Sequence, residues 1–182
     1  MTAFEFIFPL FGLLLGLSYA EMLAGLARAL KSHRHIRIGW LTPLLGLLVL
    51  INLTMFWFGA WQFRSSPVPT SGSLLLTLLI GGIYFLAASL VFPDRDDPVA
   101  DLDEHFLSIR RMAILAIAIC NLIGLWLLAA NAGWDMRPAW WIVNGLWLAA
   151  LLATALVRDR RIALAGLVVM IAFHGLALFL GG

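Results

Sequence analysis

The sequence has few charged residues and a single cysteine. Only 12% of its 182 residues are charged and 63% are hydrophobic, whereas about a quarter of the residues in a typical soluble domain are charged. A chain this apolar lacks the polar side chains that a water-soluble monomer needs on its surface, so we expect an integral membrane protein. Because Cys120 has no second cysteine to pair with, an internal disulfide and a thiolate metal cluster are both excluded.

The chain also lacks a basic segment at its start and a basic stripe elsewhere. It begins MTAFEF, whereas a cleaved signal peptide begins with basic residues, so we expect the first apolar segment to be retained. The sequence has an isoelectric point near 9.2, but its twelve basic residues flank apolar segments and form no stripe for nucleic acid. Orientation in a membrane explains this distribution better.

Six apolar segments are long enough to cross a bilayer. A hydrocarbon core about 30 Å thick needs roughly 20 apolar residues in a helix. The connections between the segments contain the Pro, Gly and Ser residues that are typical of turns. The sequence therefore predicts one all-α domain over residues 1–182, a polytopic bundle of six transmembrane helices. The expected spans are 4–30, 40–63, 72–92, 112–131, 138–157 and 162–180.

The basic residues also predict the orientation of the bundle. Of the twelve Lys and Arg residues, only Arg64 and Arg137 fall on one side of the expected membrane, and the other ten fall on the opposite side. Loops rich in Lys and Arg face the cytoplasm. We therefore expect both termini on the outer side of a cell membrane, most simply a bacterial inner membrane.

Six of the ten acidic residues lie in an acidic connector, residues 93–111, between the third and fourth spans. We expect a turn followed by a helix that begins at Pro98, since proline is tolerated at the first helical position. An apolar stripe at near-helical spacing predicts an interfacial amphipathic helix that lies on the inner leaflet and leads into the fourth span. This stripe consists of Val99, Leu102, Phe106 and Ile109.

The same connector is a candidate metal or proton site. Asp101, Glu104 and His105 are spaced so that they can share one helical face, and carboxylates with imidazole suit several divalent ions. His33 or His35 could approach from the neighbouring loop. No zincin or EF-hand pattern is present, and the plainer interpretation is a solvated acidic face that pairs with nearby arginines. No cofactor is predicted, because the spans hold a single histidine and haem ligation by two histidines is therefore disfavoured.

Each expected span contains one strongly polar side chain. Ionisable residues within spans usually face the bundle interior and mark an ion or substrate route, so these residues could line a polar path. The alternative is interhelical hydrogen bonding, worth on average about 0.6 kcal/mol per contact. Hydrogen bonding is favoured for the Asn and Tyr residues, and both interpretations stay open for Glu21 and His174. The six residues are Glu21, Asn52, Tyr84, Asn121, Asn144 and His174.

A stripe of small residues runs along the first span on the side opposite Glu21. Gly12, Gly16, Ala20 and Ala27 form this stripe, and small residues let transmembrane helices approach closely. If both faces of the span are packed against protein, this helix is central in the bundle or bridges two subunits.

Three functions are compatible with this sequence. The first, which the sequence favours, is a pathway for an ion or small solute, a channel or transporter, in which Glu21 is the key residue. The second is a non-catalytic membrane module, either a sensor or a subunit of a larger complex that docks through the acidic connector. The third is an intramembrane enzyme that acts on lipid, which ranks last because no nucleophile–base pairing is visible. The expected partners are the lipid bilayer and a second copy or another membrane protein, and nucleic acid is not expected.

Overall fold

The computed structural model describes residues 3–61, 70–94 and 99–180, and in these ranges the chain forms six α-helices and no strand. Five of the helices, α1 to α5, are long and apolar enough to cross a membrane. These findings confirm the all-α architecture. The helices are α1 (Ala3–Lys31), α2 (Leu41–Ala60), α3 (Ser71–Val91), α4 (Leu102–Asn131), α5 (Pro138–Leu156) and α6 (Arg160–Leu180).

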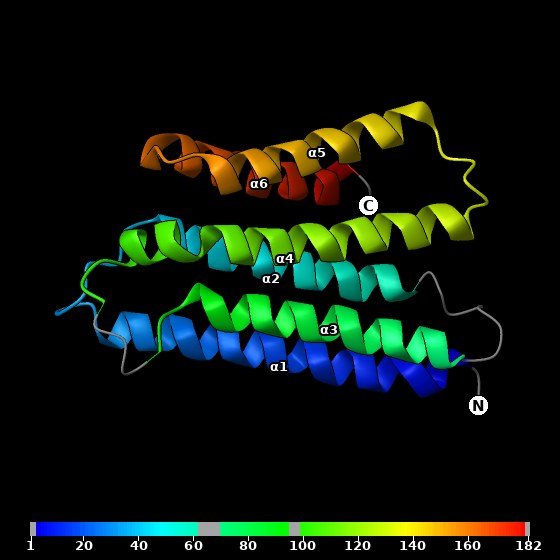
Figure 1. The fold of residues 1–182 in the computed structure, drawn as a ribbon, viewed down its shortest axis with the longest axis horizontal. Coiled ribbons are helices and arrows are strands. Elements are labelled where there is room, and N and C mark those ends of the chain that lie inside the picture. Colours follow the sequence, from blue (N-terminus) through cyan, green and yellow to red (C-terminus); the bar gives the residue numbers. More distant parts are fainter. Residues whose placement is uncertain (1–2, 62–69, 95–98, 181–182) are drawn as a thin grey trace.

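The helices pack as three layers of two (Figure 1). α1 lies against α3, α2 lies against α4, and α5 lies against α6. The α2–α4 layer is the middle one, because α2 also contacts α1 and α6 while α4 also contacts α3 and α5. The ends of α1, α3 and α5 and the starts of α2, α4 and α6 lie at one end of the bundle, which we call the loop end.

The core follows the middle layer. Leu45, Leu48, Val49 and Leu53 of α2 are fully buried, and α2 is the most enclosed of the five apolar helices, with 44% of its most apolar stretch buried against 22% for α1. α1 therefore lies at the edge of the bundle. The small-residue stripe on α1 is largely unpacked, because Ala20 and Ala27 are exposed and no atom lies within 4 Å of a side chain added at Gly16.

The acidic connector differs from its expected structure. The predicted helix start at Pro98 lies outside the described residues. The helix begins at Leu102, and Asp101, the residue before it, accepts a hydrogen bond from the backbone N–H of Asp103 at 2.8 Å. An aspartate in this position caps a helix because it satisfies one of the free N–H groups of the first turn. No separate interfacial helix is present among the described residues, since 102–131 form one continuous helix of 30 residues.

The apolar stripe of the connector packs on protein. Leu102 and Phe106 are 1% and 0% exposed, and Val99 and Ile109 are partly buried against the same core. From Leu102 onward the stripe forms one helical face, and that face is turned to the inside of the bundle. The position of this helix relative to a leaflet stays a prediction.

Candidate functional site

Two of the six polar residues that were expected within the spans meet at the centre of the bundle. The side-chain amide of Asn121 on α4 donates to Oδ1 of Asn52 on α2, with an N–O distance of 3.0 Å. Each amide also donates to the carbonyl four residues earlier in its own helix, Leu48 at 2.9 Å and Ile117 at 2.9 Å. This contact joins the two central helices, and it matches the interhelical hydrogen bond expected for an asparagine in a span.

Tyr84 on α3 is packed as an apolar side chain. Its ring is fully buried and lies edge-on to Phe56 of α2, with 5.0 Å between the ring centroids. Its hydroxyl has no hydrogen-bond partner among the described residues. A buried hydroxyl without a partner costs roughly 1–3 kcal/mol, so the oxygen of Tyr84 does not contribute to stability.

We expect Tyr84→Phe to leave stability unchanged or to raise the free energy of unfolding by about 1 kcal/mol, because the substitution removes only an unpartnered buried hydroxyl. Tyr19, the other tyrosine of the chain, is the matched control, because its hydroxyl donates to the carbonyl of Leu50 at 3.1 Å. Tyr19→Phe should lose about 1 kcal/mol. Thermal unfolding of both purified variants in detergent measures the difference, and equal losses in the two would contradict this assignment.

Asn144 and His174 have separate local partners. The amide of Asn144 donates to the carbonyl of Trp140 at 2.8 Å. Nδ1 of His174 lies 2.9 Å from the carbonyl of Met170, and its ring lies edge-on to Trp147, with centroids 5.3 Å apart. Both side chains are thus engaged within or between α5 and α6.

Glu21 forms an ion pair within its own helix. Nη2 of Arg28 donates to Oε1 of Glu21 at 3.1 Å, and the two side chains are 28% and 31% exposed. Leu14 contacts Gly81 of α3, where an added Cβ would lie 2.7 Å from Leu14. Residues seven apart share a helical face, so Glu21 and Arg28 lie on the edge of α1 beside α3. The structure joins Asn52 to Asn121. Glu21, Asn144 and His174 contact other residues, and the hydroxyl of Tyr84 has no hydrogen-bond partner among the described residues.

At the loop end, the acidic connector is bound to the loop before α2. Oδ1 of Asp103 accepts hydrogen bonds from the backbone N–H groups of Trp40 at 3.1 Å and Leu41 at 2.9 Å. Trp40 has no side-chain cap of its own to offer α2. Asp103 therefore caps α2 from α4, where a carboxylate also interacts favourably with the positive end of the helix dipole. The hydroxyl of Thr42 adds a buried bond to the carbonyl of Leu102 at 2.6 Å.

The backbone reinforces this contact, which we call the clasp (residues 36–42 with 99–105). Arg37 N–H donates to the carbonyl of Ala100, and Leu102 N–H donates to the carbonyl of Arg37, both at 2.9 Å. Gly39 follows with φ of +62°, and a side chain there would collide with the carboxylate of Asp103. A positive φ is readily adopted only by glycine, so Gly39 allows the loop to pass over Asp103.

The three residues of the candidate metal site are divided between two partners. Asp101 and Glu104 each place a carboxylate oxygen near the guanidinium of Arg160, at 3.5 and 3.6 Å. Nε2 of His105 instead lies 3.2 Å from the carbonyl of Leu90, at the end of α3. In the described part of the chain, no three His, Cys, Asp or Glu side chains form a group that could hold a metal ion.

Arg110 is a buried residue whose role the sequence analysis missed. It is 5% exposed, and its Nε donates to the carbonyl of Ala155 at 3.1 Å while Nη1 donates to Leu107 at 3.2 Å. Ala155 lies in the last turn of α5, where carbonyls have no partner in their own helix. The sequence shows the pair Arg110–Arg111 at the start of an apolar segment, but no local signal tells which of the two faces inward.

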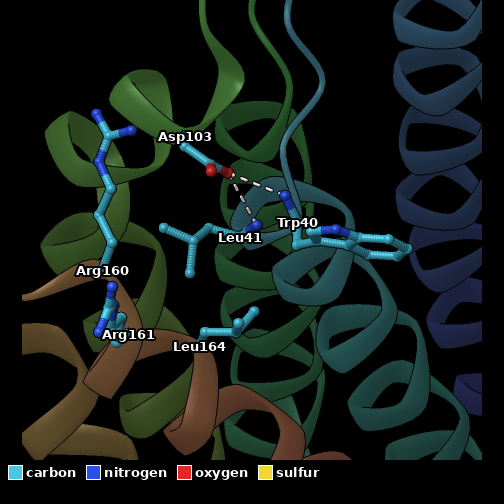
Figure 2. Close-up of a pocket in the computed structure, with 6 residues that line it drawn as sticks. All are labelled: Trp40, Leu41, Asp103, Arg160, Arg161 and Leu164. Atoms are coloured by element: carbon cyan, nitrogen blue, oxygen red, sulfur yellow. Dashed lines mark hydrogen bonds between the residues drawn. The ribbon is translucent and has the colours of Figure 1, made fainter.

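A pocket of about 120 Å³ lies between the starts of α2 and α6 (Figure 2). Asp103 reaches into it from α4 while capping α2, and the first turn of α6 forms the facing wall. The lining residues are Trp40, Leu41, Asp103, Arg160, Arg161 and Leu164.

The chain was compared with protein-family models, with curated protein sequences and with solved structures, and none of these comparisons found a match.

Proposed function

We propose that the chain crosses a bacterial inner membrane six times, with both termini outside the cytoplasm. In support, α1 to α5 are long and apolar enough to span a bilayer, and α6 has 21 residues, as many as α3. Arg34 lies in the loop between α1 and α2, and Arg158 lies in the loop between α5 and α6, so both belong to the loop end of the bundle. The positive-inside rule therefore favours a cytoplasmic loop end.

Thiol labelling of intact cells tests this topology. The only native thiol, Cys120, is fully buried, so the unaltered protein should not react with a membrane-impermeant reagent. Asp135→Cys, in the exposed loop between α4 and α5, should be labelled in intact cells. His35→Cys, in the exposed loop between α1 and α2, should be labelled only after the cells are permeabilised. The reverse pattern would overturn the proposed orientation.

Within this arrangement, the proposed function is that of a non-catalytic membrane module, a subunit or sensor that works through a second copy or another membrane protein. The observation that supports it is the Glu21–Arg28 ion pair, whose side chains are about 30% exposed on the edge helix α1. Ionisable groups inside spans normally face protein or water rather than lipid. A neighbouring protein that covers this edge would satisfy that requirement.

The size of the complex extracted from native membranes in a mild detergent tests this function. We expect a mass well above the 20.1 kDa of one chain after the detergent contribution is removed. The double variant Glu21→Gln, Arg28→Gln should shift the protein toward the single-chain mass, because the polar edge that the partner covers is neutralised. Asp135→Asn, an exposed loop acid, is the control and should not shift it. A wild-type protein of single-chain mass would contradict the proposal.

A pathway for an ion or small solute is the second candidate function. The specific observation that favours it is again an ionisable pair within an apolar helix, and such a path would follow the α1–α3 edge past Glu21. Flux into liposomes that contain the purified protein, compared with Glu21→Gln, tests it, and absence of flux for every ion and solute tried would exclude it. A lipid-acting enzyme gains no support, because Asp101 and Glu104 pair with Arg160 while His105 contacts the carbonyl of Leu90.

A further inference from the structure

We propose that the pocket between the starts of α2 and α6 binds the headgroup of a zwitterionic glycerophospholipid that carries a primary amine. The inference rests on the membrane placement proposed above, since it requires the loop end to lie at the headgroups of the inner leaflet. It is independent of the proposed module and pathway functions. Its basis is that groups of both charge signs, together with apolar walls, meet in one pocket of suitable size.

The cationic side of the pocket is Arg161, whose guanidinium is exposed and has no carboxylate within ion-pair distance among the described residues. Arg160 beside it is held at 3.5 and 3.6 Å by Asp101 and Glu104 but is still 43% exposed. A guanidinium has five N–H donors, so Arg160 retains donors for a further ligand. Together the two side chains offer a phosphate oxygen a charged hydrogen bond from Arg161 and a second one from Arg160.

The anionic side of the pocket is Asp103. Its Oδ1 accepts both backbone N–H groups at the start of α2, and no described residue donates a hydrogen bond to its other oxygen, Oδ2. An ammonium group can donate to that oxygen, whereas a second anion there would be repelled. The carboxylates of Asp101, Glu104 and Asp159 also lie near the arginines, so a purely anionic headgroup fits this region poorly.

The apolar walls and the position of the pocket fit a lipid. Leu41 and Leu164 line the pocket. Trp40, which is 71% exposed, also lines it, and tryptophans commonly mark the membrane interface. The pocket volume of about 120 Å³ is several times the roughly 30 Å³ that a water molecule takes in the liquid. Basic pockets between helices on the cytoplasmic side are known to bind lipid headgroups, and here Asp103 adds a negative charge to such a pocket.

Lipid retention by the purified protein tests this assignment. The protein is equilibrated with mixed micelles that contain equal amounts of phosphatidylethanolamine, phosphatidylglycerol and phosphatidylcholine, and the lipids that stay bound are counted by native mass spectrometry. We expect phosphatidylethanolamine to be retained preferentially. Arg161→Gln should reduce that retention about tenfold, the equivalent of one charged hydrogen bond, and Leu164→Trp should abolish it by filling the pocket.

The controls separate the alternatives. Arg158→Gln removes an exposed arginine that does not line the pocket and should leave retention unchanged. Equal loss in Arg158→Gln, preference for phosphatidylglycerol, or no preference in the wild type would each overturn the proposal. Displacement of the lipid by millimolar inorganic phosphate would also overturn it, because the site would then recognise free phosphate.

If Leu164→Trp does not fold, as judged by circular dichroism, the surface substitution Arg161→Gln decides alone. If the lipid-retention experiment fails but the thiol labelling gives the expected pattern, the proposed topology stands and only the lipid site is overturned.

Discussion

Replacing Gly39 by alanine should lower the free energy of unfolding by about 3 kcal/mol. Two effects add at this position. Gly39 has φ of +62°, a conformation that costs a residue with a side chain about 1–2 kcal/mol. The new methyl group would also meet the carboxylate of Asp103, which must then move away from the N–H groups of Trp40 and Leu41.

The chain supplies a control that separates strain from collision. Gly133 has nearly the same φ, +63°, but nothing lies within 4 Å of its added side chain, so Gly133→Ala should show the strain alone. In an Asp103→Ala background, Gly39→Ala should likewise cost only about 1 kcal/mol. Unfolding in mixed micelles, followed by tryptophan fluorescence, measures all of these variants. Equal destabilisation by Gly39→Ala and Gly133→Ala would show that the clasp does not hold Asp103 in place.

Phe92→Ala should destabilise the protein by roughly 3 kcal/mol, the lower end of the range for a buried phenylalanine. Phe92 directly follows α3 and is 4% exposed. Its ring lies between two glycines, since an added Cβ would approach it to 2.6 Å at Gly25 of α1 and 3.4 Å at Gly46 of α2. In a membrane the loss comes from packing rather than from transfer to water, so the lower end of the range applies.

Phe58→Ala is the matched control for this prediction. Phe58 lies on α2 and is 69% exposed, so replacing it by alanine should change the free energy of unfolding in mixed micelles very little. The tight slot between Gly25 and Gly46, which holds the ring of Phe92, can also be tested by enlarging a glycine. Gly25→Ala should cost about 1–3 kcal/mol by overpacking. Gly16→Ala, which has open space around it, should be neutral or slightly stabilising. Similar effects of the two glycine substitutions would contradict a tight slot around Phe92.

Together these contacts assign the acidic connector a structural role. Phe92 anchors its start, Asp103 caps α2, and Asp101 with Glu104 pairs with Arg160 of α6. The connector thereby ties α2, α3, α4 and α6 together at the loop end. Asp101, Asp103 and Glu104 all contact other elements of the chain, so we place the proposed partner contact at the edge of α1.

The sequence by itself determined the class of the protein and the position of its helices. A stretch of about 20 apolar residues is a local property of the chain, and the expected first span, 4–30, differs from α1 (Ala3–Lys31) by only one residue at each end. The acidic connector was less predictable. Its start depends on Asp101 rather than on Pro98, and its apolar face turns to the core because Leu102 and Phe106 meet buried residues of other helices.

Only the tertiary structure decided which polar side chains meet. Asn121 bonds Asn52 across 69 positions, Asp103 caps Leu41 across 62, and Arg110 reaches Ala155 across 45. These contacts depend on the rotation and register of each helix. Spans that are apolar on every side have no polar face to mark their orientation, so the sequence predicts that these helices form but not which side of each one faces inward.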